Sequence, residues 1–411
     1  MNIVQVNNCD LMGRRFNGHD LQLSLNEQGH EAYQIVLEKA GDNSTTIPLL
    51  STNELFVRSR LKNLESQLSI NSLIYPYGKV LYEHSVFQKA DIVHYHLIHN
   101  NFLSILDFPK LTSKKPSVWT VHDPWVITGH CIHPCDCTGW RTGCHNCPKL
   151  DDFTFPMKVD KASEMWKIKK ESYKNLDIDI IVASDFMEKC IMESPLTAHL
   201  NRIHKIPFGI NVDVFQQSDK SKARGRWNIP ERNFVISFRA ELNEIKGLSY
   251  IIEMLKKLDT TYPVTLLTLG LQTLPRDITG KFQIVELGWQ NNQDLLVDFY
   301  TASDVFLMPS LAESFGLMAI EAMASGCPII VFENTVLAEI TFAPECGIAV
   351  PYKNADYLEI EVSRLLNNPA ECKWRGEKGK ELASRFYRYE NYLKSHTALY
   401  RDILDRKSIN S

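Results

Sequence analysis

The sequence predicts an α/β fold of two domains, each built on a doubly wound parallel sheet. The chain has 411 residues, more than the roughly 250–300 at which a single hydrophobic core usually stops growing. Short β-rich runs alternate with helical patterns along nearly the whole length, as in βαβ units. Several of these runs are apolar throughout, as expected for parallel strands that are buried on both faces.

Candidate strands occur in both halves, with helical patterns between them. In the first half they are residues 2–6, 32–36, 92–95, 117–121 and 178–183. In the second half they are residues 233–238, 264–269, 283–287, 305–308, 329–332 and 348–350. The main helical patterns cover residues 21–28, 80–89, 247–258, 293–301, 315–324 and 357–366. The polar stretch 216–226 is the predicted linker, so we expect one domain over 1–215 and a second over 216–388.

Composition excludes several classes of protein. Lys and Arg total 45 against 49 Asp and Glu, a net charge of −4, which gives no global reason to expect nucleic-acid binding. The first residues show no basic head followed by an apolar stretch, and no apolar run approaches the ~20 residues of a membrane span. We therefore expect a cytoplasmic protein whose ten cysteines serve as thiols, metal ligands or packing residues rather than as a disulfide framework.

The segment 309–328 is the most informative part of the chain. It follows a buried strand and holds Glu313, Ser314 and Gly316 in a loop before a helix that begins near Leu317 and ends at Gly326. The start of such a helix presents free backbone N–H groups, and a glycine allows close approach. The pattern predicts an anion site suited to a pyrophosphate.

Four segments together resemble the retaining GT-B glycosyltransferases of family 4. Glu313-Ser314-Phe315-Gly316 followed by Glu321 is similar to the family signature. Arg239 followed by Lys246-Gly247, the turn at 206–215 and the strand end at 119–123 with His122 agree with it in order and spacing. The resemblance spans roughly residues 3 to 400.

The resemblance implies a role for each matching residue. Arg239 and Lys246 would neutralise the diphosphate of a nucleotide-sugar donor, Glu313 would hydrogen-bond the sugar and Glu321 the ribose. His122 would lie near the transferred sugar, contacting it through its backbone carbonyl. The implied catalytic set is His122, Glu313, Arg239 and Lys246. The implied donor-binding set is Gly18, Arg239, Lys246, Glu313, Ser314, Phe315, Gly316, Leu317 and Glu321.

The resemblance also implies an architecture and a reaction. Two Rossmann-like domains would face each other across a cleft, and a closing helix within 389–411 would cross back to the first domain. A hexose would pass, with retention and without an obligatory divalent metal, from a nucleotide-diphosphate sugar to a glycan or polyprenyl-diphosphate-linked glycan of a cell-surface polysaccharide. Two alternatives stay open: a non-catalytic partner in glycan assembly and a sugar-nucleotide epimerase of the same architecture.

The sequence departs from the family in two loops. Relatives often carry paired glycines after the first strand, whereas this chain has Gly13 and Gly18 apart, so only Gly18 maps well. Arg14 or Arg15 beside them could assist an anionic acceptor. The stretch 333–339 also lacks the usual Thr and paired glycines, which leaves the identity of the donor open.

Five cysteines gather in an inserted loop within residues 124–150. Cys144-x-x-Cys147 has zinc-knuckle spacing, and Cys131 with Cys137 would complete a four-thiolate structural zinc site. Such a loop needs a staple if it has no core of its own. The other ligands considered are His133 and His145. The alternatives are free buried thiols, a redox pair, and a zinc module for nucleic acid, against which the scarcity of nearby Lys and Arg argues.

A basic helical stretch covers residues 157–175. Six lysines occur in it together with Met165, Trp166, Ile168 and Tyr173. A basic amphipathic helix can rest on an anionic membrane, which would suit a lipid-linked acceptor at the inner face of the cell membrane. The simpler interpretation, which we favour, is a solvated helix that packs through its apolar side.

Overall fold

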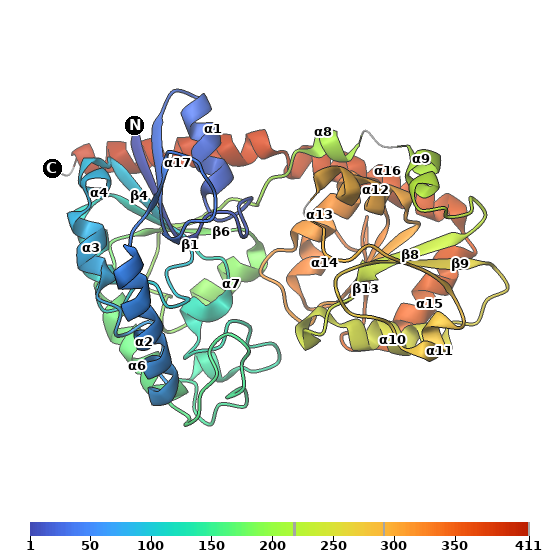
Figure 1. The fold of residues 1–411 in the computed structure, drawn as a ribbon, viewed down its shortest axis with the longest axis horizontal. Coiled ribbons are helices and arrows are strands. Elements are labelled where there is room, and N and C mark those ends of the chain that lie inside the picture. The colour runs from blue at the N-terminus through green and yellow to red at the C-terminus, as the bar shows by residue number, and fades with distance from the viewer. Residues whose placement is uncertain (217–218, 291, 410–411) are drawn as a thin grey trace. The chain divides into compact units, whose positions relative to one another are not determined.

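The computed structural model describes residues 1–216, 219–290 and 292–409. The chain forms two compact units (Figure 1), the first made of Met1–Ile206 with Leu393–Ser411 and the second of Pro207–Tyr392. The sequence had placed the boundaries at 215/216 and 388/389. They differ because Ile210 pairs with Arg388 in a parallel bridge and Phe208 packs edge-on against Phe315, so the turn after Ile206 belongs to the second unit.

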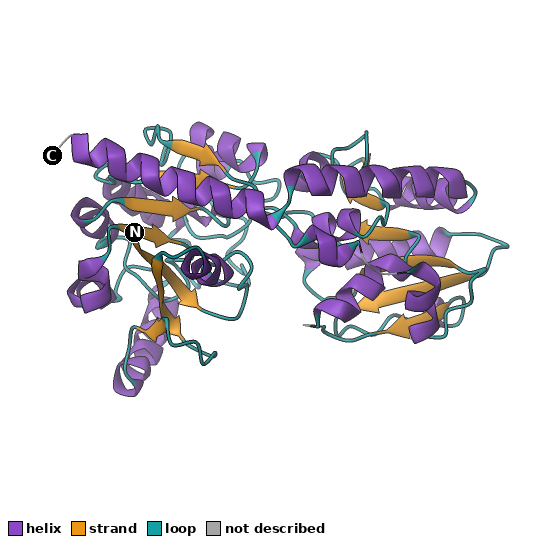
Figure 2. Ribbon diagram, turned by 90° about the horizontal axis from the view of Figure 1, so that it is seen from above, coloured by secondary structure: helices purple, strands orange, loops and turns teal. Residues whose placement is uncertain are grey.

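The first unit is built on a seven-stranded parallel sheet in the order β3-β2-β1-β4-β5-β6-β7. Its strands are β1 Asn2–Cys9, β2 Glu31–Glu38, β3 Thr46–Pro48, β4 Ile92–Tyr95, β5 Ser117–Thr120, β6 Asp179–Val182 and β7 Ile203–Lys205. Its helices are α1 His19–Glu27, α2 Thr52–Leu68, α3 Tyr77–Glu83, α4 Ser85–Lys89, α5 Phe108–Lys114, α6 Ala162–Tyr173 and α7 Asp185–Glu193, with the short 3₁₀ turns η1 Pro124–Ile127 and η2 Gly139–Arg141. Helices cover both faces of the sheet (Figure 2).

The second unit repeats the plan with a six-stranded parallel sheet in the order β10-β9-β8-β11-β12-β13. Its strands are β8 Phe234–Arg239, β9 Val264–Leu269, β10 Gln283–Glu286, β11 Val305–Met308, β12 Ile329–Phe332 and β13 Ile348–Val350. Its helices are α8 Val212–Phe215, α9 Lys220–Arg226, α10 Leu248–Lys257, α11 Arg276–Thr279, α12 Gln293–Ala302, α13 Leu317–Ala324, α14 Val336–Ile340, α15 Ala355–Leu366 and α16 Pro369–Phe386, with the turn η3 Glu244–Lys246.

Both sheets have the strand order of a doubly wound fold, in which the chain reverses direction across the sheet at one point. That point lies between β1 and β4 in the first unit and between β8 and β11 in the second. In the second unit, β11 and its neighbour β12 are apolar runs in which every residue is buried. The prediction of two doubly wound α/β domains is confirmed. Ligands in such folds bind beyond the carboxyl ends of the strands at this point.

Two edge strands escaped the sequence analysis. β3 and β7 have only three residues each and carry Pro48 and Lys205, so neither shows an apolar run. They form because the neighbouring strands offer free backbone partners, as when Ile35 pairs with Ile47 and Ile181 with His204. Tertiary pairing overrides weak local preference at a sheet edge.

The predicted linker at 216–226 is wrong over most of its length. Residues 217–218 lie outside the described part of the chain, but α9 follows at Lys220–Arg226. Arg224 is buried, and its guanidinium donates to the carbonyl of Ala302 at 3.1 Å and to Asp304 at 2.6 Å. The polar composition therefore reflects a charged helix anchored to the second unit.

The C-terminal helix α17 (Tyr389–Ile409) returns to the first unit, as expected. Tyr400 is buried there and lies 2.6 Å from His94. Arg406 pairs with Asp179 at 2.7 Å, and Lys407 pairs with Asp177. Asp177 and Asp179 thus hold the C-terminal helix against the first unit.

No helix among the described residues is both long and apolar enough to cross a membrane. The predicted basic helix appears as α6, and its lysines are not all on a solvent face. Lys169 is fully buried. Its ammonium group donates to the carbonyls of Trp125 at 2.6 Å and Thr128 at 3.0 Å.

Candidate functional site

The reversal point of the second sheet brings together residues that lie far apart in the sequence. Arg239 is the last residue of β8, and Ser310 and Glu313 lie in the loop that follows β11. Because β8 and β11 are hydrogen-bonded neighbours, their carboxyl ends meet at the same edge of the sheet. Lys246 reaches this edge from the short turn η3.

Gly247 allows the two loops at this edge to touch. Its φ of 76° is left-handed, and a Cβ atom there would lie 2.0 Å from the carbonyl oxygen of Pro309. The backbone N–H of Leu311 also donates to the carbonyl of Ile245 at 2.7 Å. Only glycine combines this backbone conformation with such close approach, so the Lys246-Gly247 pair is explained by geometry.

Two ion pairs occupy the edge. Lys246 Nζ lies 2.7 Å from Glu313 Oε1, and Ser310 Oγ donates to the same carboxylate oxygen at 3.1 Å. Arg239 pairs with Glu241 at 2.6 Å, and its guanidinium stands 4.9 Å from the ring centre of Trp289. Polar groups thus face one another in pairs of opposite charge.

A hollow of about 280 Å³ opens among these side chains. Its polar lining comes from Arg239, Lys246, Ser310 and Glu313, and its apolar lining comes from Phe306, Leu307, Met308 and Met318. The side chains of Lys246 and Glu313 are only 19% and 14% exposed. Charges in such a partly buried place act more strongly than on an open surface.

The start of α13 closes the same loop. Gly316 has a φ of 107°, and a Cβ atom there would lie 2.5 Å from Leu337 Cδ2. Phe315 is buried, with its ring 5.8 Å from that of Tyr387. Of the predicted donor-binding segment, Phe315 therefore packs in the core, while Gly316 and Leu317 form the helix start.

Glu321 lies deeper than the other predicted site residues. It is 1% exposed, and the hydroxyl of Tyr300 in α12 donates to its Oε2 at 3.0 Å. Contact of this carboxylate with a nucleoside stays a prediction, because the structure gives the side chain a buried protein partner.

A second group of predicted residues lies at the reversal point of the first sheet. His122 follows β5, and its Nε2 is 2.9 Å from His96 Nδ1 at the end of β4. His96 Nε2 lies 2.7 Å from Gln5 Oε1 in β1. Gly18 begins α1 beside them with a φ of 88°, and a Cβ atom there would lie 2.5 Å from His96 Nε2. Gly18, expected as a phosphate contact, thus leaves space for the His96–Gln5 hydrogen bond.

These histidines are uncharged at neutral pH. Burial lowers the pKa of His122 to about 3; Asp123 opposes this shift, and His99 and His396 add to it. Burial also holds the pKa of His96 well below its usual range, with further contributions from His94, His122 and His396.

Of the two arginines proposed for an acceptor, Arg14 pairs with Asp20 at 2.6 Å in a half-exposed position.

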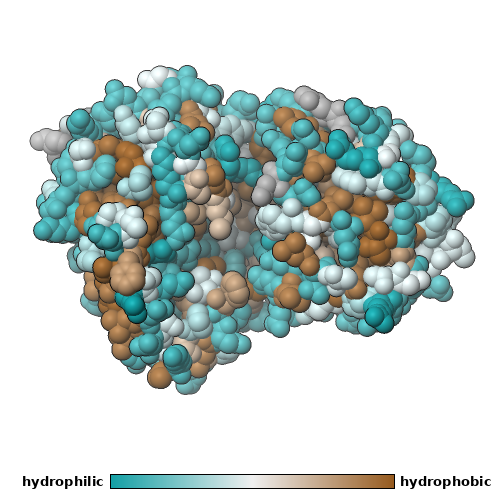
Figure 3. Space-filling view, viewed as in Figure 1, coloured by the Kyte–Doolittle hydropathy of each residue, from teal (hydrophilic) through white to brown (hydrophobic). Residues whose placement is uncertain are grey.

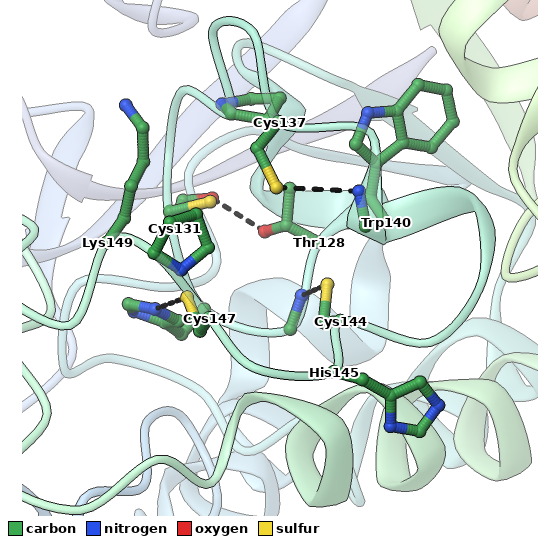
Figure 4. A pocket seen from close by; sticks show the side chains of 13 residues that line it. Thr128, Cys131, Cys137, Trp140, Cys144, His145, Cys147 and Lys149 are labelled. Atoms are coloured by element: carbon green, nitrogen blue, oxygen red, sulfur yellow. Dashed lines mark hydrogen bonds between the residues drawn. The ribbon is translucent and has the colours of Figure 1, made fainter.

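The Cys-rich loop of the first unit forms a pocket of its own (Figure 4). Cys131, Cys137, Cys144 and Cys147 all line it, together with His130 and His145. Cys144 Sγ accepts from the backbone N–H of Gly129 at 3.2 Å, and Cys147 Sγ lies 3.1 Å from His130 Nε2. Within the described residues, however, no three His, Cys, Asp or Glu side chains are arranged to hold a metal ion.

The structure shows what the loop packs against. A small apolar cluster joins Trp125 of the loop to residues outside it, and Cys144 and Cys147 lie against this cluster; the outside members are Ile105, Phe155, Met157, Ala162 and Met165. Lys169 ties the loop to α6 through the two carbonyls noted above. Order in the loop therefore has a source other than a metal.

Several residues at the two edges were missed by sequence analysis. In the second unit they are Ser310, Glu241 and Trp289. In the first they are Gln5 and His96. One signal was available: His94 and His96 stand two residues apart in an otherwise apolar strand, which places both on the same face of the sheet.

One protein family and several known proteins are similar to this chain. Residues 219–382 match the family described as "Glycosyl transferases group 1". An uncharacterised 41.2 kDa protein in the cps region of Klebsiella pneumoniae is 23% identical over 77% of this chain and 80% of its own length. A putative colanic acid biosynthesis glycosyl transferase, WcaC of Escherichia coli K12, is 35% identical over 21% of this chain and 22% of its own. The Anabaena protein Alr3699/HepE, solved with UDP and glucose, is 14% identical, covers 97% of this chain and 99% of its own, and has a TM-score of 0.66.

Apart from the Klebsiella protein, the chain spans about half or less of the length of the curated relatives it matches. The structural likeness extends over nearly the whole chain, which has the GT-B fold. The residues that match the family model, 219–382, include Arg239, Lys246, Glu313 and Glu321.

Proposed function

We propose that the protein is a retaining glycosyltransferase of family 4, which moves a hexose from a nucleotide-diphosphate sugar to a glycan or lipid-linked glycan acceptor. One observation carries the proposal: Arg239, Lys246 and Glu313 converge on one hollow at the reversal point of the second sheet. The Anabaena protein solved with UDP and glucose supports a nucleotide-sugar donor. The relative named for colanic acid biosynthesis supports a role in polysaccharide biosynthesis.

The chemistry required of this hollow is electrostatic. As the glycosidic bond breaks, negative charge gathers on the departing nucleoside diphosphate. Preorganised cations and N–H groups that meet this charge are usually the largest catalytic term. Arg239 would offer a two-pronged donor to phosphate and Lys246 a compact charge, while the first N–H groups of α13 would add their dipoles.

The ion pairs give these cations a defined state before the donor binds. Glu313 and Glu241 hold the charges of Lys246 and Arg239 in place. A diphosphate would replace them as the partner of each cation. Glu313, once released from Lys246, would turn its acceptors to the hydroxyls of the sugar.

The test is donor-dependent release of nucleoside diphosphate across a panel of UDP-, GDP- and ADP-sugars. Arg239→Ala and Glu313→Ala are expected to abolish release. Arg276→Ala and Glu253→Ala are the matched controls, because both residues are exposed on neighbouring helices. Full activity in both site variants would remove the proposal.

Three further readouts separate the alternatives. Anomeric NMR of the product distinguishes retention from inversion, and activity in EDTA tests independence from a divalent metal. Release of nucleotide that is equally fast without acceptor indicates an epimerase or a hydrolase instead. Donor binding without turnover across the panel indicates a non-catalytic partner.

We also propose that the first unit rests on the cytoplasmic face of an anionic membrane. On α2, Phe56, Val57, Leu64 and Leu68 are exposed along one face with Arg60 among them. Figure 3 shows apolar side chains along the surface where α2 lies in Figure 1. An exposed apolar stripe with a basic residue is suited to a membrane interface.

Sedimentation with vesicles that contain anionic phospholipid tests this surface. The double variant Phe56→Asp, Leu64→Asp is expected to leave the pellet. Ser66→Asp, on the opposite face of α2, is the control with a smaller change of charge. Equal sedimentation of all three proteins, or none by the wild type, contradicts the membrane proposal.

Finally, we propose a structural zinc ion bound by Cys131, Cys137, Cys144 and Cys147. Support comes from their shared pocket (Figure 4) and from the backbone N–H groups that donate to Cys137 and Cys144. Binding requires the side chains to converge further than they do in the structure. Metal analysis of the purified chain is expected to find one zinc, lost in Cys144→Ser, Cys147→Ser and kept in Cys190→Ser. A metal-free wild type, purified with zinc present, refutes the site.

A further inference from the structure

A continuous chain of hydrogen bonds, buried except for its partly buried last contact, leads from the C-terminal helix to His122. Tyr400 in α17 accepts from Gln5 Nε2 at 3.3 Å, and Gln5 Oε1 lies 2.7 Å from His96 Nε2. His96 Nδ1 then lies 2.9 Å from His122 Nε2. At its other end, Tyr400 is 2.6 Å from His94 Nδ1. All of these atoms belong to the first unit.

The amide of Gln5 gives this chain a direction. Gln5 directs its N–H group at Tyr400 and its carbonyl at His96, so His96 must donate from Nε2. Burial keeps His96 neutral, and a neutral imidazole carries only one proton. His96 Nδ1 is therefore an acceptor, and the N–H on the His122 side of the contact belongs to His122 Nε2.

Packing around His122 holds this arrangement. The rings of His96 and His122 lie 5.2 Å apart and 24° from parallel, and the ring of Phe16 lies 5.5 Å from His122. Gly18 has no side chain to displace His96. The imidazole of His122 is thus fixed in both orientation and protonation.

We propose that Gln5, His96 and Tyr400 are positioning residues that keep His122 as a neutral imidazole with its proton on Nε2. The proposal rests on the proposed function, in which His122 lies near the transferred sugar. A sugar that leaves a diphosphate develops positive charge at its anomeric carbon. An imidazolium beside it would oppose this charge, whereas a neutral ring does not.

Two-bond ¹H–¹⁵N NMR of the full-length protein reads the tautomer directly, with His122→Asn used to assign the signal. The wild type is expected to show the Nε2–H form at pH 7. A Nδ1–H or doubly protonated His122 overturns the proposal whatever the enzyme does, so this readout is independent of the proposed function.

Two variants probe the positioning role. In Gln5→Glu, the new carboxylate can only accept hydrogen bonds and would favour a doubly protonated His96. His96 would then donate from both ring nitrogens, so that His122 Nε2 becomes an acceptor and the proton of His122 moves to Nδ1. Tyr400→Phe removes the hydroxyl that orients Gln5 and serves if Gln5→Glu does not fold. We expect kcat to fall about tenfold, with KM for the donor nearly unchanged, and the tautomer signal to change in the same variant.

Tyr95→Phe is the matched control. Tyr95 is the buried last residue of β4, directly before His96, and its ring packs against Phe108. The variant should keep both the tautomer and kcat. Wild-type kcat and an unchanged tautomer in Gln5→Glu and Tyr400→Phe would overturn the positioning role, even if Arg239→Ala confirms the transferase. No transfer by the wild type, with the Nε2–H form present, would instead refute the transferase and leave the hydrogen-bond chain standing.

Discussion

Replacing His96 with Asn should make the first unit less sensitive to acid. The physical reason is the burial of three histidines, His94, His96 and His122, each with a pKa that burial lowers. In the unfolded chain such residues bind a proton below about pH 6.5, whereas in the folded state they stay neutral. The unfolded state therefore binds more protons, and stability is lost as the pH falls below this value.

The magnitude follows from the linkage relation. Between pH 6.5 and 5.5, each histidine that is neutral only when folded costs about 1 kcal/mol, or about 3 kcal/mol for the three. Asn at position 96 can still accept the hydrogen bond from His122 through its amide oxygen but cannot bind the proton. The variant should therefore lose about 1 kcal/mol less than the wild type over this interval.

Hydrogen exchange measured by mass spectrometry on peptides from β4 gives the opening free energy of this unit alone. Measurements at pH 6.5 and 5.5, corrected for intrinsic exchange, supply the two slopes. The exposed His145 provides the control, since His145→Asn should leave the slope unchanged. Parallel pH dependence in His96→Asn and the wild type would show that His96 is not a neutral buried residue.

Three other outcomes are expected. Lys246→Met should lower kcat/KM for the donor at least about 100-fold, while the exposed Lys256→Met changes it little in the same assay. Gly247→Ala should reduce the urea-unfolding free energy by about 2–4 kcal/mol through steric clash; Gly288→Ala, also at positive φ but with open space around it, should cost only about 1 kcal/mol. Burial lowers the pKa of Lys169 to about 7, so between pH 7.5 and 9 the unfolded state binds about one more proton than the folded state. The free energy of unfolding should therefore rise by about 1.4 kcal/mol per pH unit because of this residue. Lys169→Met should remove that slope.

The charged half of the candidate site could be anticipated from the family resemblance, because its residues lie in short, ordered segments. Arg239 ends an apolar strand, and Glu313 stands between such a strand and a helix. Strand ends and helix starts are visible in local patterns, and parallel strands bring their carboxyl ends to one edge. What those patterns could not give is pairing: that Lys246 meets Glu313 and Arg239 meets Glu241.

The histidine chain shows the opposite case. Gln5, His96, His122 and Tyr400 come from four separate elements, and nothing in the local sequence of one refers to another. Gly18 illustrates the consequence: its phosphate contact stays a prediction, and nothing in its loop indicated that it also provides the space for the hydrogen bond of His96. Residues 220–226 of the supposed linker likewise form a helix, which the partners of Arg224 anchor to the second unit.

The sequence by itself determined the alternation of strand and helix, the two-domain α/β plan and the residue types at the edge of the second sheet. These depend on local periodicity and on the preference of apolar residues for burial, which act over a few residues at a time. The tertiary structure alone decided which side chains form hydrogen bonds and ion pairs with one another, because these contacts join residues that lie up to hundreds of positions apart in the sequence. Burial, which lowers the pKa of an imidazole or an ammonium group and so determines its charge, exists only in the folded structure.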